Sequence, residues 1–283
     1  MTELRQITVI GLGLLGGSLT SAILDRLPKV KVIGYTHRAT TRQRARQLAV
    51  ATEIVNRLTD SVRDADLVIL ATPVRTFEKI FNRIADSMPA GCIITDVGST
   101  KIWPHRWAAK QLPKTVYYVG SHPIAGSQKR GIDAVDKKKN LFDKATCILT
   151  ATKKTNRQAV QTLKKFWSDL GCVVRLMRPA EHDRILANVS HLPQIAATAL
   201  VNASRAKELR LAGTGFKDTT RIASGPANIW ADILLTNAKN STRGIDRVMA
   251  ELVKLKKAIN SGNERQVKQL LNRARKKREA VIN

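Results

Sequence analysis

Apolar residues in the first half of the chain fall into short runs that are separated by longer amphipathic stretches. The strand-like runs are ITVIGLG (7–13), KVIGY (31–35), DLVILATP (66–73), CIITDVG (92–98), VYYVGSHP (116–123) and TCILTA (146–151). The stretches between them, such as Leu15 to Asp25 and Phe77 to Ser87, are long enough for crossover helices. This alternation predicts a doubly wound α/β sheet.

From about Met177 the strand signal fades and helical periodicity replaces it. One apolar stripe comprises Ile245, Val248, Met249, Leu252, Leu255 and Ile259. The SGNE segment (261–264) then predicts a turn with a capping box before another basic helix. We therefore predict an α/β domain over residues 1–176 and an all-helical domain over residues 177–283, with a boundary near MRPAEHD.

Neither a secretory signal peptide nor a membrane-spanning segment is indicated by the sequence. Its opening, MTELRQ, leads directly into a strand-like run without the regions of a secretory signal, so we expect a cytoplasmic protein. The most apolar later stretch, residues 185–201, contains Asn188 and Ser190, which would be costly in hydrocarbon. We expect this stretch to be a buried helix.

The three cysteines, Cys92, Cys147 and Cys172, lie far apart in apolar surroundings and lack CxxC spacing. We expect reduced thiols in the core and no metal site.

The net charge of +27 is the most unusual bulk property. Lys and Arg occur throughout, with denser clusters at KKKN (137–140) and RARKKRE (273–279). Such a charge attracts anionic metabolites and, without regard to sequence, nucleic acid. Aromatic residues make up only 4% of the chain and do not alternate with the basic clusters. A base-stacking surface is therefore not indicated, and we expect solvated basic faces and no specific nucleic-acid partner.

The first strand-like run ends in a GxGxxG pattern formed by Gly11, Gly13 and Gly16. These glycines follow a strand, open a helix and belong to the first βα unit, which is the context that favours dinucleotide binding. Gly11 permits a tight turn, Gly13 lets the backbone approach the phosphates, and Gly16 allows close helix packing. The alternative is a strand and helix that are merely closely packed.

The end of the second strand indicates which dinucleotide is preferred. An acidic residue about twenty positions after the glycines would bind the ribose hydroxyls of NAD, but Thr36 stands there. His37, Arg38, Thr41 and Arg42 follow it. A guanidinium beside hydroxyls suits a 2′-phosphate, so NADP is favoured over NAD. The alternative is that Arg38 stacks on the adenine of either cofactor.

Several further segments carry a family resemblance. They are ATPV (71–74), TDVGSTK (95–101), GSHPIAGSQKRG (120–131), HDRILANVSHLP (182–193) and GTGFKDTTRIA (213–223). In this order they resemble the prephenate and arogenate dehydrogenases of tyrosine biosynthesis, over essentially the whole chain. The predicted cofactor site comprises Gly11, Gly13, Leu14, Leu15, Gly16, Thr36, His37, Arg38, Thr41, Arg42, Thr72 and Pro73.

The resemblance implies oxidative decarboxylation of a cyclohexadiene with NAD(P). A hydride leaves the ring carbon that bears the 4-hydroxyl, the hydroxyl loses its proton, and carbon dioxide departs as the ring becomes aromatic. His122 matches the family histidine that contacts the 4-hydroxyl, and Ser99 matches the serine that helps to place it. From the residues alone, His122 before a proline suits a structural role, and Ser99 suits a helix N-cap.

The resemblance also implies which side chains bind the substrate. Arg221 matches an arginine that pairs with a substrate carboxylate, and Lys217 and Asp218 match a pair at the pocket entrance. The remaining matches are His182, His191 and Trp230. A surface arginine, satisfied helix histidines and a core tryptophan are the structural alternatives.

Two residues depart from the family pattern. Gln128 replaces a common glutamate after GSHPxAG, and Gln194 replaces a common histidine after SHLP. Both changes remove an ionisable group near the substrate, so they bear on the choice between prephenate and arogenate without settling it.

Dimerisation through the helical half is also implied, and the stripe from Ile245 to Ile259 suits it. Two other functions stay open. One is another two-domain NADP oxidoreductase, of the hydroxyacid dehydrogenase or imine reductase kind. The other is a basic nucleic-acid-binding protein with an inactive dinucleotide-binding domain.

Overall fold

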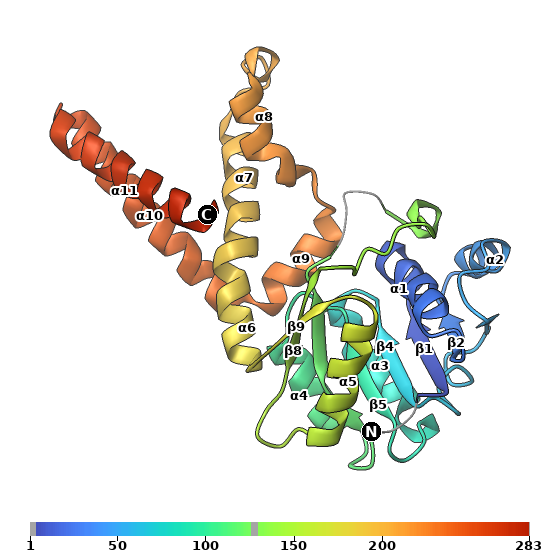
Figure 1. The fold of residues 1–283 in the computed structure, drawn as a ribbon. Helices are drawn as coiled ribbons and strands as arrows, with labels where there is room; N and C mark the ends of the chain where they lie inside the picture. Colours follow the sequence, from blue (N-terminus) through green and yellow to red (C-terminus); the bar gives the residue numbers. More distant parts are fainter. Residues whose placement is uncertain (1–3, 126–129, 283) are drawn as a thin grey trace. The chain divides into compact units, whose positions relative to one another are not determined.

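The computed structural model describes residues 4–125 and 130–282, and its elements are drawn in Figure 1. Two compact units form: residues up to 186 together with 224–237, and residues 187–223 together with 238–283. Within the described ranges, no helix is both long enough and apolar enough to cross a membrane.

The first unit contains a six-stranded parallel sheet in the order β3-β2-β1-β4-β5-β6. Its strands are β1 (Gln6–Ile10), β2 (Lys31–Tyr35), β3 (Glu53–Ile54), β4 (Leu67–Leu70), β5 (Ile93–Asp96) and β6 (Tyr117–Tyr118). The strand order reverses between β1 and β4, which is the place where doubly wound sheets bind ligands. The predicted doubly wound sheet is confirmed, and the short edge strand β3 was not expected.

A second, three-stranded sheet follows in the same unit, in the order β7-β8-β9. Its strands are β7 (Gly120–Pro123), β8 (Thr146–Thr150) and β9 (Val173–Met177). The prediction of one strand over VYYVGSHP was wrong. Val119 still donates its backbone N–H to Ile94 of β5, but the next residues pair antiparallel with β8. The chain therefore changes sheets immediately before His122.

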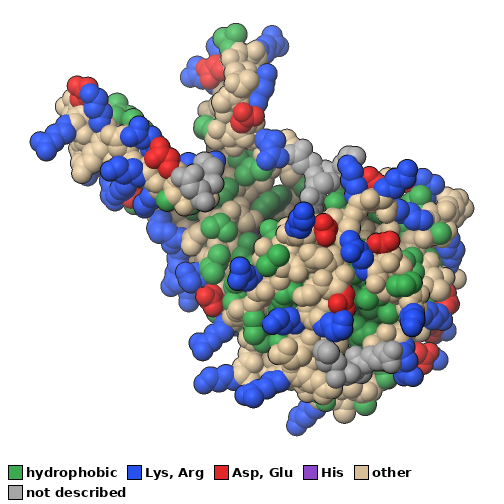
Figure 2. Space-filling model, viewed as in Figure 1, with side chains coloured by type: hydrophobic (Ala, Val, Ile, Leu, Met, Phe, Trp, Pro, Cys, Tyr) green, Lys and Arg blue, Asp and Glu red, His purple; other side chains and the backbone are tan. Residues whose placement is uncertain are grey.

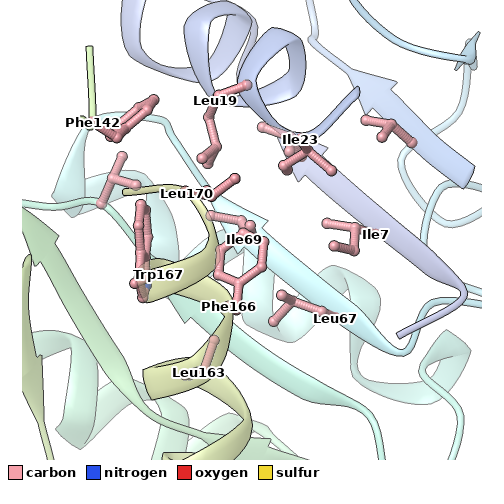
Figure 3. Packing of buried hydrophobic residues seen from close by; sticks show 14 of the residues in the cluster. Ile7, Leu19, Ile23, Leu67, Ile69, Phe142, Leu163, Phe166, Trp167 and Leu170 are labelled. Atoms are coloured by element: carbon pink, nitrogen blue, oxygen red, sulfur yellow. The ribbon is translucent and has the colours of Figure 1, made fainter. Parts of the chain in front are cut away.

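Both faces of the main sheet are covered by helices, which explains why LVIL of β4 is buried at every position. Leu67 and Ile69 contribute to one core, with side chains from α1 (Leu14–Arg26) and α5 (Arg157–Asp169), as Figure 3 shows. Val68 and Leu70 contribute to the opposite core, because side chains alternate along a strand. That core includes residues of α3 (Phe77–Ile84) and α4 (Ile102–Gln111).

The other helices of the first unit are α2 (Ala39–Gln47), α6 (Pro179–Leu186) and α9 (Ala227–Thr236). α9 is held to the sheet unit by polar contacts, although it lies late in the sequence. Asp232 accepts the Arg75 backbone N–H at 3.0 Å, and the hydroxyls of Thr236 and Thr100 lie 2.9 Å apart. The first compact unit therefore includes a segment from late in the sequence, residues 224–237. A single domain boundary at residue 176 stays a prediction.

The second unit is all-helical, as predicted, and contains α7 (Leu192–Ala203), α8 (Thr214–Thr220), α10 (Ala238–Asn260) and α11 (Glu264–Ile282). A π-helical turn, Ala187–His191, precedes α7. Pro193 stands just after this turn, and a proline ring clashes with the carbonyl four residues earlier in a regular α-helix. A local widening relieves that clash.

α10 and α11 form an antiparallel hairpin, in which Arg273 of α11 pairs with Glu251 of α10. The predicted capping box at Ser261 was wrong. The side chain of Asn263 caps α11 by accepting the Gln266 backbone N–H at 3.0 Å, while the Ser261 hydroxyl donates to Ala258. The turn needs Gly262 at φ +60°, which brings Asn263 rather than Ser261 to the helix start.

Candidate functional site

The carboxyl edge of the main sheet gathers segments from five places in the sequence. Parallel strands end at the same edge, so the loops after β1, β2, β4, β5 and β6 meet there. The glycine turn follows β1, Thr72 and Pro73 follow β4, and Ser99 follows β5. His122 lies on β7, a few residues beyond β6. The predicted cofactor residues and Ser99 therefore follow strand ends at one edge of the main sheet, and His122 lies on β7 of the second sheet, shortly after β6 ends.

The glycine turn has the geometry of a phosphate-binding backbone. Gly11 has φ +103°, and a Cβ there would lie 2.6 Å from the Ala71 carbonyl oxygen. A Cβ at Gly16 would lie 1.8 Å from the Gly11 carbonyl oxygen, so only glycine lets α1 start so close to β1. A Cβ at Gly13 would meet nothing within 4 Å. The backbone at Gly13 is thus open to a ligand, and the first helical turn that begins at Leu14 and Leu15 contains no acidic residue.

The loop after β2 separates the residues predicted to choose the cofactor. Thr36 is buried, whereas His37 and Arg38 are exposed and Thr41 is half-buried. Arg42 Nη1 donates to the carbonyl oxygens of Thr36 and His37, at 2.8 and 3.0 Å. Arg42 therefore stabilises the loop by binding its backbone. Arg38, at the start of α2, is exposed.

His122 belongs to a chain of three hydrogen-bonded side chains. Its Nδ1 lies 2.8 Å from Nε2 of His182, and Nδ1 of His182 lies 2.8 Å from Oδ1 of Asp183. His182 and Asp183 are fully buried, whereas His122 is half-buried. Burial lowers the pKa of His182 below its ordinary value of 6.5, although the hydrogen bond to Asp183 opposes this shift.

Asp183 also replaces the helix cap that was predicted from Ser99. Its carboxylate oxygens accept the backbone N–H groups of Lys101 and Ile102, at 2.7 and 2.9 Å, where α4 begins. The N-cap alternative for Ser99 is therefore wrong, because a carboxylate from a distant segment takes the position. Ser99 itself is half-buried.

A buried ion pair lies beneath these residues, between Asp96 at the end of β5 and Lys101. Asp96 Oδ1 also accepts the Tyr118 hydroxyl at 2.7 Å and the Ser121 backbone N–H at 3.3 Å. Burial, and then the charge of Asp96, hold the pKa of the Tyr118 hydroxyl well above its ordinary value. This network fixes the residue that precedes His122.

The side chain of Ser121 is held as well. Its Oγ lies 2.6 Å from the hydroxyl of Thr95 and accepts the Trp167 indole N–H at 3.0 Å. The segments TDVGSTK and HDRILANVSHLP contain Asp96, Lys101 and Asp183, but the sequence did not predict a role for these three residues. Asp96 carried a signal, because it is a carboxylate at the end of an apolar strand, where a charge is buried only when it is paired.

The predicted substrate residues are divided between the units. Arg221, Lys217 and Asp218 are exposed residues of the second unit, on α8 and on the short turn that follows it. Trp230 lies on α9 of the first unit and is half-buried, so a fully buried core tryptophan is not what the structure shows. Gln128 lies outside the described residues.

His191 and Gln194 are buried in the second unit, at the π-helical turn and in the first turn of α7. Gln194 is 4% exposed, and its Oε1 has no hydrogen-bond partner among the residues that the structure describes. A buried amide oxygen in that condition is costly, so it suits a position that a ligand completes.

Predictions from the sequence also covered metal ligands, the cysteines and the surface charges. No group of three or more His, Cys, Asp or Glu residues in the described parts of the chain could hold a metal ion. Cys92, Cys147 and Cys172 are buried free thiols, as predicted. Lys and Arg side chains are spread over the visible surface rather than gathered in one patch (Figure 2), which fits solvated basic faces.

Two family models match the chain. Residues 19–176 match the prephenate dehydrogenase nucleotide-binding domain, and residues 178–273 match the prephenate dehydrogenase dimerization domain.

Characterised relatives are similar over most of the sequence. The chain is 35% identical to the cyclohexadienyl dehydrogenase of Zymomonas mobilis over 268 residues, which are 92% of this chain and 90% of the relative. It is 36% identical to the prephenate dehydrogenase of Bacillus subtilis, over 88% of this chain and 69% of the relative.

Solved structures of prephenate and arogenate dehydrogenases are similar to the whole chain. The prephenate dehydrogenase of A. aeolicus, crystallised with hydroxyphenyl propionate and NAD⁺, has a TM-score of 0.91 and 32% identity, covering 99% of each chain. The arogenate dehydrogenase of Synechocystis has a TM-score of 0.83 and 26% identity, covering 98% of this chain and 100% of its own.

Proposed function

The chain belongs to the prephenate dehydrogenase family, and we propose that it catalyses the NAD(P)-dependent oxidative decarboxylation of prephenate or arogenate in tyrosine biosynthesis. The observation that carries this proposal is the match of both halves of the chain to the two domains of one enzyme family. In the reaction the 4-hydroxyl loses its proton, a hydride leaves the same ring carbon, and the ring carboxylate leaves as carbon dioxide. A bound nicotinamide would supply the hydride acceptor. The electron pair of the broken C–C bond makes the ring aromatic and leaves its oxygen as a phenolate, which takes a proton back.

His122 is the general base of this proposal. An imidazole titrates near neutral pH, so it can take the hydroxyl proton as the hydride leaves. The position of His122 past the carboxyl edge of the sheet supports the assignment, because doubly wound sheets bind their dinucleotides at that edge. Ser99, which follows β5 at the same edge, helps to place the hydroxyl.

The glycine turn would hold the dinucleotide, with the start of α1 offering its backbone N–H groups to the pyrophosphate. The open space over Gly13 and the left-handed backbone of Gly11 support this placement. From the sequence we assign to the same site the residues Leu14, Leu15, Thr72 and Pro73. The side chain of Thr72 lies within 2.8 Å of the Cβ that Gly11 lacks.

We assign the enzyme a preference for NADP over NAD. The loop after β2 offers no carboxylate for ribose hydroxyls at Thr36, and Arg38 is exposed where a 2′-phosphate would lie. The hydroxyl of Thr41 and the N-terminal backbone of α2 add donors for that phosphate, while Arg42 keeps the loop in shape.

Substrate carboxylates pair with Arg221, whose fork gives orientation as well as charge. Lys217 and Asp218 flank it on α8 and form the entrance. His191, Gln194 and Trp230 complete the substrate contacts, and Gln128 is assigned to the same group from the sequence. The unsatisfied Oε1 of Gln194 can accept from an ammonium group, and the amide nitrogen can donate to a carboxylate.

We also propose a homodimer formed through the helical unit. Met249, Leu252 and Ile259 of the predicted stripe are 58, 59 and 60% exposed in the single chain. An apolar stripe left open on a long helix is stabilised by covering it with a second copy. The dimerization-domain match over residues 178–273 supports this assembly.

Steady-state assays of the purified protein, with prephenate and arogenate each crossed against NAD and NADP, test the function. Reduced cofactor, released carbon dioxide and an aromatic product should appear in equal amounts with at least one substrate. Absence of turnover in all four combinations would overturn the proposal. Salt-sensitive retention on DNA without turnover would instead favour a nucleic-acid-binding protein.

A further inference from the structure

We propose that His182 and Asp183 are positioning residues that fix the protonation state of His122, so that Nε2 of His122 is the nitrogen that accepts the substrate's hydroxyl proton. This inference deepens the proposed function and rests on it. His182 was predicted above to contact the substrate, but its geometry gives it another role. All three side chains belong to the first compact unit.

The position of Asp183 is fixed by three hydrogen bonds. Its two carboxylate oxygens accept from the backbone of Lys101 and Ile102, and its carbonyl oxygen accepts from Nδ2 of Asn237 at 2.7 Å. An ionised carboxylate only accepts hydrogen bonds. The nitrogen of His182 that lies 2.8 Å from Oδ1 must therefore carry a proton, and that nitrogen is Nδ1.

A neutral imidazole carries a proton on only one of its two nitrogens. When Nδ1 of His182 carries the proton, Nε2 holds a lone pair and accepts. The atom that faces it at 2.8 Å is Nδ1 of His122, which must therefore donate. His122 is then protonated on Nδ1, and its Nε2 is left as the basic nitrogen.

His182 can accept from His122 only while its imidazole is neutral. If it were charged, both of its nitrogens would donate, and His122 would have to turn its lone pair toward His182 and away from substrate. His182 is fully buried, and burial disfavours its charged form. Of the charges that act on it, Lys101 also disfavours protonation, while Asp183 and Asp96 favour it. Because Asp96 pairs with Lys101, their effects oppose each other.

The arrangement also helps the reaction to proceed. Once His122 has taken a proton on Nε2, it is a cation whose Nδ1–H bonds to a neutral acceptor that is itself bonded to a carboxylate. A charge-assisted hydrogen bond of that kind is stronger than a neutral one. The pair therefore makes His122 a stronger base and holds its ring in one orientation.

Histidine ¹⁵N NMR measures the protonation pattern without any substrate. The chain has five histidines, so the spectrum is simple, and His122→Asn and His182→Asn identify the two signals. We expect both His122 and His182 to be protonated on Nδ1 in the wild-type protein near pH 7.5. A wild-type His122 protonated on Nε2 would overturn the proposal.

Two amide variants of His182 distinguish a role in positioning His122 from a role in packing alone. Glutamine can place an acceptor where Nε2 of His182 stands, whereas asparagine reaches only the Nδ1 position. His182→Asn should lower kcat by about 10- to 100-fold with little change in KM, and should move the acid limb of the kcat/KM profile to lower pH. His182→Gln should restore most of kcat and keep the Nδ1 proton on His122.

His105→Gln is the matched control, since His105 is another half-buried histidine of this unit that bonds to Thr150 instead. It should leave the His122 signal and kcat near wild type. A His182→Asn enzyme that loses kcat while the His122 signal keeps its wild-type pattern would show a structural role and refute the proposal. If that variant does not fold, the wild-type spectrum and His182→Gln decide. Absence of wild-type turnover would refute the proposed function separately, because the protonation pattern needs no turnover.

Discussion

Arg42 donates from Nη1 to the backbone carbonyl oxygen of Thr36 at 2.8 Å. At the end of β2, Arg42 is therefore bound to the loop itself, whereas Arg38 is not engaged by this bond. A guanidinium that is engaged with two carbonyl oxygens braces the loop. Arg38 lies four residues earlier, exposed at the start of α2. The cofactor's 2′-phosphate should therefore be recognised by Arg38 rather than by Arg42.

Arg38→Asp should move the preference from NADP toward NAD. The aspartate repels a 2′-phosphate and accepts from free ribose hydroxyls, so we expect kcat/KM for NADP to fall by about 100-fold. Steady-state kinetics with both cofactors measure the ratio. Arg63→Asp makes the same charge change at an exposed site and should leave the ratio alone. An unchanged NADP efficiency in Arg38→Asp would exclude Arg38 as the selecting residue.

His122→Asn should affect turnover rather than binding. Asparagine keeps a hydrogen-bonding group at the site but cannot act as a base near neutral pH, so kcat should fall by about 10²- to 10⁴-fold while KM stays similar. Initial rates across pH 5 to 9 check the assignment. Near-normal kcat with an unchanged pH profile would remove His122 from the mechanism.

Arg221→Ala should act mainly through KM. A carboxylate contact exists before as well as during the reaction, so its loss weakens substrate binding more than it slows the chemical step. We expect KM for prephenate or arogenate to rise by at least about tenfold. Arg210→Ala removes another exposed arginine of the second unit and serves as the control. Equal KM values in the two variants would argue against Arg221.

Leu252→Glu should dissociate the dimer. The substitution places a charge in the middle of the exposed apolar stripe of α10, where covering it in an interface is costly. Light scattering should give twice the 31.3 kDa protomer mass for the wild type and a single protomer for the variant. Ala250→Glu puts the same charge on the opposite face of α10 and should remain dimeric. A wild-type protein that is monomeric at micromolar concentration would contradict the assembly.

Acid should destabilise the fold through His105. Burial lowers the pKa of His105 from 6.5 to about 4, so between these values the unfolded chain holds a proton that the folded chain lacks. Stability then rises with pH in that window and is lost as pH falls from about 6.5 to about 4. The difference is on the order of 3 kcal/mol for this one residue.

His105→Gln should therefore flatten the dependence of stability on pH. Calorimetric or denaturant unfolding at pH 7 and pH 4.5 measures it, and the comparison of slopes is independent of any constant loss caused by the substitution. Equal slopes in the variant and the wild type would show that His105 titrates alike in both states.

The sequence alone predicted the elements whose physics is local. Apolar runs such as LVIL of β4 indicate strands buried on both faces, and the GxGxxG turn requires glycine wherever a side chain would meet backbone. The helical second half and its apolar stripe followed from periodicity in the same way. The conformation of these elements depends on neighbours within a few residues along the chain, so the sequence pattern was sufficient to predict them.

Contacts between distant segments were decided only by the tertiary structure. The strand VYYVGSHP was divided between two sheets because β8, whose first residue lies 23 positions after Pro123, competes with β5 for its backbone groups. α9 joined the sheet unit through Asp232 and Thr236, although it lies within the predicted helical half that follows Met177.

The same limit applies to the candidate site. An HD pair in a sequence does not reveal that Asp183 caps a helix that begins 81 residues earlier, or that His182 faces His122. Hydrogen bonds of this kind depend on which side chains meet when the chain is compact, and no local pattern encodes that meeting. The sequence determined which groups were available for proton transfer, whereas the tertiary structure decided which nitrogen of His122 is left as the base, because only folding brings a buried carboxylate and a second imidazole into line with it.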